Sequence, residues 1–155
     1  MSRILRVLAM TPAVFLALGP ADAGNTGQTL LQAATSIRCT FSLMAAGTLG
    51  NEQPGAEVKP ADLVLEFEAI NADEGTAQLA SGFGSYDIIV RYARGYLHFI
   101  QSFLDGPLYV TTLLERETAA GGLKAMHSRH AYTDFALPGF TSSPEQYYGE
   151  CDVTG

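Results

Sequence analysis

The chain has few cysteines, few basic residues and no catalytic signature, and each shortage excludes a class of function. Only nine of its 155 residues are Lys or Arg, against 16 Asp and Glu, and the basic residues form no run of three. A surface with this charge repels phosphate backbones and anionic head groups, which argues against binding to nucleic acid or to a membrane surface. If the protein has a macromolecular partner, long-range electrostatics favour a basic one.

Motifs that would support catalysis or cofactor binding are also missing. No GxSxG nucleophile turn occurs, and Gly82-Phe83-Gly84 is too short for a phosphate-binding loop. Asn71, Asp73 and Glu74 share one turn but do not match a calcium loop of the EF-hand type. We therefore expect a protein that is not an enzyme and holds neither a metal nor another cofactor.

The N-terminus has the order of a cleavable export signal. Arg3 and Arg6 precede an apolar run, 7–18, and the small-residue tripeptide Ala21-Asp22-Ala23 follows it. The run is shorter than the roughly 20 residues that a membrane-spanning helix needs, and Pro12 interrupts it. We expect residues 1–23 to be removed and the mature protein to be exported, to the periplasm or the extracellular space, without remaining in the membrane.

The mature chain, 24–155, has the length of one domain and would carry seven basic and fifteen acidic residues, a net charge of −8. Its only cysteines, Cys39 and Cys151, lie near its two ends. Because the export signal directs them to an oxidising compartment, they are expected to form one disulfide. The alternative, a metal or redox pair, lacks the CxxC spacing.

The mature chain is expected to be all-β. In 63–70, apolar residues alternate with residues that include Glu66 and Glu68, so one face is expected to be buried and the other solvated. Leu63, Leu65, Phe67 and Ala69 form the expected apolar face. Eight strands separated by turn residues are predicted, at Ile37–Ala45, Leu63–Ile70, Thr76–Ala80, Tyr86–Tyr92, Tyr96–Phe103, Leu108–Leu114, Leu123–Tyr132 and Gln146–Val153.

Strands this close in sequence pair as antiparallel neighbours, so a meander is expected. Eight strands can close into an up-and-down, lipocalin-like (calycin-like) barrel without free edges, and we favour this barrel over a β-sandwich. The disulfide would then join the first strand to the last. The predicted strands are too short, and lack the aromatic girdles, for an outer-membrane barrel. Thr26–Ile37 reads as either a short helix or an irregular lead-in, and the long loops Gly47–Asp62 and Thr133–Glu145 are candidates for a functional rim.

The segment 124–130 contains the most suggestive polar residues. His127 and His130 have an HxxH spacing, but along a strand His127 shares a face with Arg129 and not with His130, so the histidines do not converge on a metal. His127 and Arg129 could instead meet a carboxylate of a neighbouring strand, or bind an anionic ligand inside the barrel. We name His127, Arg129 and His98 as candidate ligand-binding residues, with core or rim packing as the alternative for His98.

Several short segments together resemble a family of uncharacterised exported bacterial proteins. They are Cys39-Thr40-Phe41, Phe67-Glu68-Ala69-Ile70, Thr111-Thr112, His127-Ser128-Arg129-His130 and Gln146-Tyr147-Tyr148-Gly149-Glu150-Cys151. That family supplies no activity. A looser similarity, through Ser81-Gly82 and Tyr86, is to the small periplasmic lysozyme inhibitors, although Arg94-Gly95 stands where a Lys-Gly pair is expected.

Two functions are therefore expected, in order. The first is a non-catalytic β-barrel that binds a small molecule or a protein. The second is an inhibitor of a basic secreted enzyme such as lysozyme. A small-molecule site inside the barrel requires a hollow interior, whereas an inhibitor requires only a surface.

Overall fold

The computed structural model describes residues 29–49, 53–82, 84–132 and 143–155. The predicted export signal, 1–23, lies outside the described residues, as does most of the loop Thr133–Glu145. The elements in chain order are α1 (Leu30–Ala33), β1 (Ile37–Thr48), β2 (Gly55–Asn71), β3 (Thr76–Ser81), β4 (Gly84–Ala93), β5 (Tyr96–Ser102), β6 (Leu108–Glu117), β7 (Leu123–His130) and β8 (Glu145–Val153).

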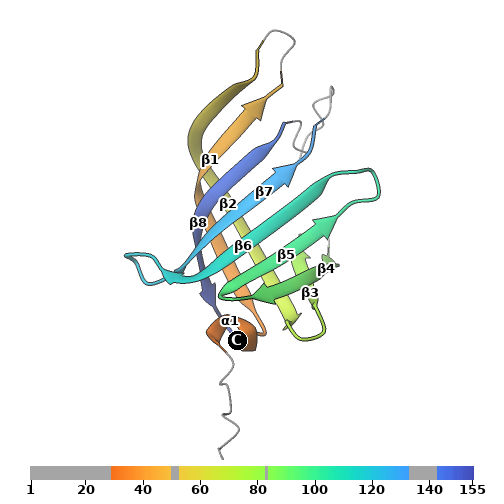
Figure 1. The fold of residues 1–155 in the computed structure, drawn as a ribbon, viewed down its shortest axis with the longest axis vertical. Helices are drawn as coiled ribbons and strands as arrows, with labels where there is room; N and C mark the ends of the chain where they lie inside the picture. The colour runs from red at the N-terminus through yellow and green to blue at the C-terminus, as the bar shows by residue number, and fades with distance from the viewer. Residues whose placement is uncertain (1–28, 50–52, 83, 133–142) are drawn as a thin grey trace, which may run out of the picture.

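The eight strands form one closed antiparallel barrel in which each strand pairs with the next and β8 pairs with β1 (Figure 1). The predicted all-β meander and its barrel closure are confirmed, and the sandwich alternative is not found. All strands except β2 lie within three residues of their predicted ends. The turns match their residues: Arg94 and Gly95, both with positive φ, form the tight turn that joins β4 to β5.

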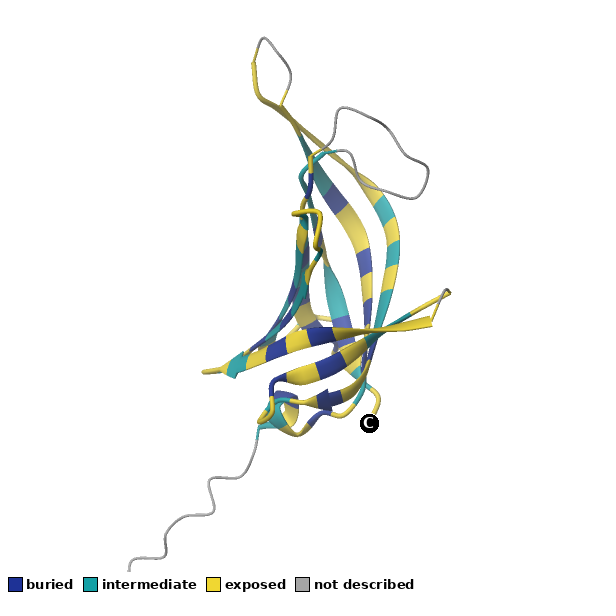
Figure 2. Cartoon of the chain, turned by 90° about the vertical axis from the view of Figure 1, so that its right-hand side faces the viewer, coloured by how far each residue is buried: buried dark blue, intermediate teal, exposed yellow. Residues whose placement is uncertain are grey.

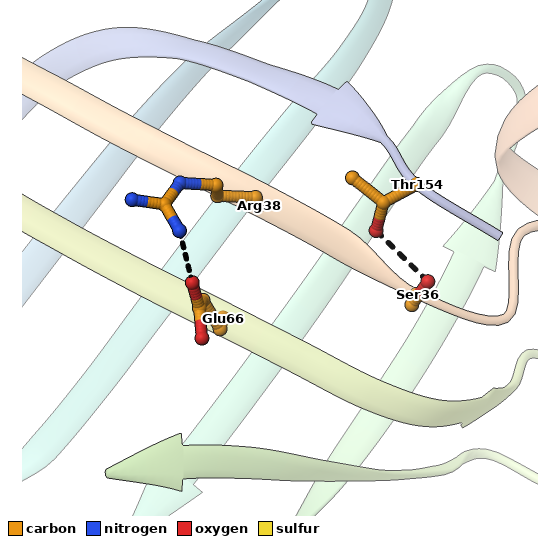
Figure 3. A network of polar contacts seen from close by, with 4 residues as sticks. All are labelled: Ser36, Arg38, Glu66 and Thr154. Atoms are coloured by element: carbon orange, nitrogen blue, oxygen red, sulfur yellow. Dashed lines mark hydrogen bonds and ion pairs between the residues drawn. The ribbon is translucent and has the colours of Figure 1, made fainter. Parts of the chain in front are cut away.

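Cys39 and Cys151 form the predicted disulfide and face one another in the register of β1 and β8. Beyond the end of that ladder, the Ser36 and Thr154 hydroxyls are 2.8 Å apart and the Thr154 N–H donates to the Ser36 carbonyl (Figure 3). On the outer surface, Arg38 of β1 forms an ion pair with Glu66 of β2. These contacts hold β1 between its two neighbours at the seam of the barrel.

The strand β2 is longer than the sequence predicts. Most of the segment Gly47–Asp62, which we expected to be a loop, is strand, because β1 continues to Thr48 and β2 begins at Gly55. The two strands form a hairpin arm that extends past the rest of the barrel and is mostly exposed (Figure 2). The prediction failed because it depended on an alternation of apolar and polar residues. The arm is instead held by backbone pairing, and both of its faces are mostly solvent-exposed.

A second correction concerns the inward face of β2. Ala69, predicted to share the buried face, is exposed, and Ile70 is buried instead. The β2–β3 register shifts between Glu68 and Asn71, and Ala69 has φ 49°. A β-bulge therefore reverses the alternation at this point, and it does so without the glycine that commonly occupies such a position.

The short α1 packs at the end of the barrel opposite the hairpin arm (Figure 1). The Thr29 side chain accepts a hydrogen bond from the Gln32 N–H, which caps the helix, and donates one to the Tyr92 hydroxyl at 2.8 Å. Leu31 is fully buried in the core. The segment Thr26–Ile37, for which the sequence left two readings open, therefore contains a one-turn helix that plugs this end.

Gly149 is required where β8 passes β1. A Cβ at this position would collide with the Thr40 carbonyl oxygen and lie 2.7 Å from the Phe41 Cα. We expect Gly149→Ala to lower the free energy of unfolding by at least about 3 kcal/mol, because backbone must move to admit the methyl group. Urea unfolding measures the loss.

The matched control for this prediction is Gly82→Ala, since no atom lies within 4 Å of a Cβ at Gly82. The control should change stability by less than about 0.5 kcal/mol. Equal effects of the two substitutions would mean that β8 and β1 do not approach as closely as the structure has them.

Candidate functional site

Side chains from opposite walls meet inside the barrel and fill it. The rings of Phe67 on β2 and Phe99 on β5 stack with centroids 3.9 Å apart, although the two strands are not neighbours. The internal void beside them, bounded also by Thr111 and His127, has a volume of about 10 Å³. It can hold no more than one water molecule. This part of the interior therefore offers no room for the small-molecule ligand that the sequence led us to consider inside the barrel.

His127 and Arg129 point into the barrel, on the shared face that strand periodicity predicts. His127 is 4% exposed, and its Nδ1 lies 2.8 Å from the Thr111 hydroxyl on β6. The Arg129 Nε donates to the His127 Nε2 at 3.2 Å. Because Nε2 accepts this bond, the neutral ring carries its proton on Nδ1 and donates it to Thr111.

Burial and, second, the charge of Arg129 lower the pKa of His127 from 6.5 to about 3. The imidazole is thus neutral at ordinary pH, both of its nitrogens are engaged, and it is a weak base. This arrangement is that of a structural histidine.

Arg129 lies among groups supplied by the neighbouring strands. Its Nη1 is 3.6 Å from Glu145 Oε2 on β8, and its guanidinium lies 5.0 Å from the ring centroid of Tyr147 and 5.4 Å from that of Tyr109. The Tyr147 hydroxyl donates to the same Glu145 oxygen at 2.6 Å. Burial, followed by this hydrogen bond, raises the pKa of Tyr147 to about 12. Of the two roles considered for Arg129, the carboxylate of a neighbouring strand is the one present.

We call these six residues, Tyr109, Thr111, His127, Arg129, Glu145 and Tyr147, the inner network. Four of its members were not named as candidate site residues from the sequence: Tyr109, Thr111, Glu145 and Tyr147. A signal for Tyr147 existed, since it is an even number of residues from the buried Cys151 and so shares its face. Thr111 and Tyr109 carry no such marker, because nothing in the sequence fixes the register of β6 against β7.

His98 is not part of the inner network. It lies on the outer face of β5, with its Nδ1 2.9 Å from the Thr112 hydroxyl and its ring beside that of Tyr96. The structure therefore brings His127 and Arg129 together and leaves His98 on the opposite face of the sheet. His130 is exposed at the end of β7, and no group of metal-ligating side chains is found within the described ranges.

The outer surface carries a belt of mostly uncharged residues that crosses seven strands. Two adjacent rows of cross-strand neighbours form it, and we call them the outer belt. One row is Ile89, Ile100, Val110, Ser128, Gln146, Ala45 and Val58, and the other is Arg91, His98, Thr112, Met126, Tyr148, Leu43 and Pro60. Arg91, at one end, is the one charged member.

Several large apolar side chains of the outer belt are solvent-exposed. Val58 is 66% exposed, Ile89 48%, Leu43 43% and Tyr148 42%. Directly opposed side chains in an antiparallel sheet lie about 5 Å apart, so Leu43 and Tyr148, which are cross-strand partners, form one apolar surface with Val58 nearby, whereas Ile89 lies at the other end of the belt. Contiguous apolar surface of this kind is typical of interaction sites.

A second feature of the outer surface is an acidic face below the outer belt. It consists of Glu66 and Glu68 on β2, Asp87 on β4 and Asp152 on β8. Glu66 and Glu68 are thus on the solvated face that their alternation predicts. Within this group Arg38 is the basic neighbour, opposite both Glu66 and Asp152.

Comparisons with family models, curated proteins and solved structures find no match to this chain. The resemblances drawn from short segments of the sequence therefore remain predictions. Across the described part of the chain, no helix combines the length and apolar character needed to cross a membrane.

The low pKa of His127 makes stability depend on pH. Unfolded His127 binds a proton below about pH 6.5 while the folded residue does not until about pH 3, so unfolding is favoured as the pH falls through this window. From about pH 7.5 to about pH 5, we expect this group alone to remove about 2 kcal/mol of stability.

Urea unfolding of the wild type and of His127→Gln at both pH values measures the part of the stability loss that is due to His127. The glutamine amide can accept from Arg129 and donate to Thr111 but does not titrate, so its variant should lose less stability on acidification. Equal losses in the two proteins would show that His127 is not buried in its neutral form.

Proposed function

We propose that this protein is an exported, non-catalytic binding module that recognises a protein partner through its outer surface. The observation that carries the proposal is the packing inside the barrel: the void beside the stacked Phe67 and Phe99 rings is about 10 Å³, too small for a ligand. The polar groups inside bind one another, and the one buried histidine is held as a weak base. These features support a non-catalytic role for the groups inside the barrel, in which they stabilise the fold and do not form an active site.

The outer belt supplies the surface for that partner. Interface cores are enriched in aromatic residues and Met and depleted of charge, and Tyr148, Met126 and Leu43 are adjacent in the belt. The buried disulfide is consistent with an oxidising compartment outside the cytoplasm. We propose the periplasm or the extracellular space as the place of action.

The role of the outer belt in binding is tested in two steps. A partner is first captured by affinity from an extract of that compartment, and its binding is then measured by calorimetry with the purified partner. Tyr148→Glu with Leu43→Glu should weaken binding by about 100-fold or more, because both place charge in a desolvated contact. Glu68→Lys, outside the belt, is the control and should retain the partner. Binding that survives the double substitution but is lost in the control would assign recognition to the acidic face instead.

The acidic face favours a second candidate function, inhibition of a basic secreted enzyme such as lysozyme. The described residues include 13 acidic and seven basic side chains, and four of the acids lie together on this face. A negative patch would steer a basic enzyme toward the barrel and orient it there.

Titration of lysozyme activity with the purified protein tests this candidate. Inhibition should weaken with added salt and fall by about tenfold in Glu68→Lys with Asp87→Lys, whereas Glu117→Lys, on β6 away from the face, should inhibit as the wild type does. Full lysozyme activity in the presence of micromolar protein would rule out the inhibitor function for this enzyme.

A further inference from the structure

The barrel is closed, but one edge of the first part of β2 has no strand partner among the described residues. The strand pairs with β1 from Gly55 to Phe67, whereas β3 pairs with it only from Glu66 to Asn71. The second edge of Gly55–Leu65 has no backbone partner among the described residues, and these residues form the outer strand of the hairpin arm (Figure 1). An open row of N–H and C=O groups is a template for another strand.

We propose that this edge pairs with the same edge of a second copy of the chain, antiparallel and about a two-fold axis at Val58. A two-fold axis perpendicular to the sheet keeps outward-facing side chains opposite outward-facing ones. Even-numbered residues must therefore pair with even-numbered residues, and odd-numbered residues with odd-numbered ones. With Val58 on the axis, Glu57 lies opposite Lys59 of the second copy and Lys59 lies opposite Glu57. Two cross-strand ion pairs then form by symmetry.

The charges select this register over its neighbours. An axis at Glu57 or at Lys59 would place two like charges directly opposite each other, which destabilises pairing. An axis at Ala56 or at Pro60 leaves both charges opposite uncharged residues or off the paired segment. Only the axis at Val58 makes the edge complementary to itself in charge.

The remaining residues of the segment are compatible with the pairing. Within one chain, Lys59 Nζ lies 4.0 Å from Glu57 Oε2, so both side chains are on one face of β2 and both are exposed. Val58 is on the other face, at the end of the outer belt, and would continue the belt into the second copy. Pro60 lies opposite Ala56 and lacks one N–H donor, which limits the pairing to a short segment and makes the dimer concentration-dependent.

Sedimentation of the purified protein over a range from micromolar to millimolar concentration tests the proposal. The wild type should show a monomer–dimer equilibrium. Glu57→Lys alone, or Lys59→Glu alone, turns both ion pairs into like-charge pairs and should weaken the dimer by about tenfold. The double swap Glu57→Lys with Lys59→Glu should restore it, and the control Glu68→Lys should leave it unchanged.

Crosslinking tests the register separately. Val58→Cys places two thiols opposite each other at the axis and should form a disulfide-linked dimer under mild oxidation, whereas Val64→Cys, also exposed on β2 but far from the axis, should not. A protein that stays monomeric at millimolar concentration overturns the proposal. A dimer whose stability is unchanged by the Glu57 and Lys59 substitutions also overturns the proposal, because its interface would then lie elsewhere. The proposal is likewise overturned if a different strand-forming partner binds this edge of β2 without displacing a dimer.

Discussion

Closure of the sheet between β1 and β8 is the constraint on which the other features depend. Cys39 and Cys151 face each other across this ladder and close a loop with a sequence separation of 112 residues. A loop of that length is expected to contribute about 4 to 5 kcal/mol by limiting the unfolded chain. Gly149 lets the backbones of β8 and β1 approach closely, and β8 in turn pairs with β7, which places Glu145 opposite Arg129. The seam therefore completes the ring of strands that encloses the packed interior and the inner network.

The packing inside the barrel is the reason why we propose that the protein acts through its outer surface. Stacked Phe67 and Phe99 join opposite walls, and α1 plugs one end. At the other end, the polar side chains are satisfied by each other: Thr111, His127, Arg129, Glu145 and Tyr147 form one chain of contacts. Buried polar groups arranged in this way fix the register of strands, because a shift by one residue would leave each of them without its partner. The outer belt, the acidic face and the hairpin arm are the surfaces at which we propose contacts with other molecules.

The sequence predicted the fold where local pattern and global fold agree. Alternation in 63–70, turn residues between strands and the positions of Cys39 and Cys151 were enough for an eight-stranded barrel closed at the first and last strands. The pattern failed at Ala69, where a bulge reverses the two faces, and in the hairpin arm, whose strands are exposed on both sides and so show no alternation. The inward direction of His127 and Arg129 followed from period two. Their partners Thr111 and Tyr109 did not, because pairing of β6 with β7 is set by contacts between strands.

We propose that this barrel holds no small molecule inside and acts through its outer surface. Native mass spectrometry of the protein, purified from its own compartment without denaturation, tests this most directly. We expect the mass of the polypeptide with one disulfide, alone, as a multiple of itself, or bound to a protein partner. A small molecule retained in stoichiometric amount and released only on unfolding would contradict it, because such a ligand would need an interior volume far above about 10 Å³.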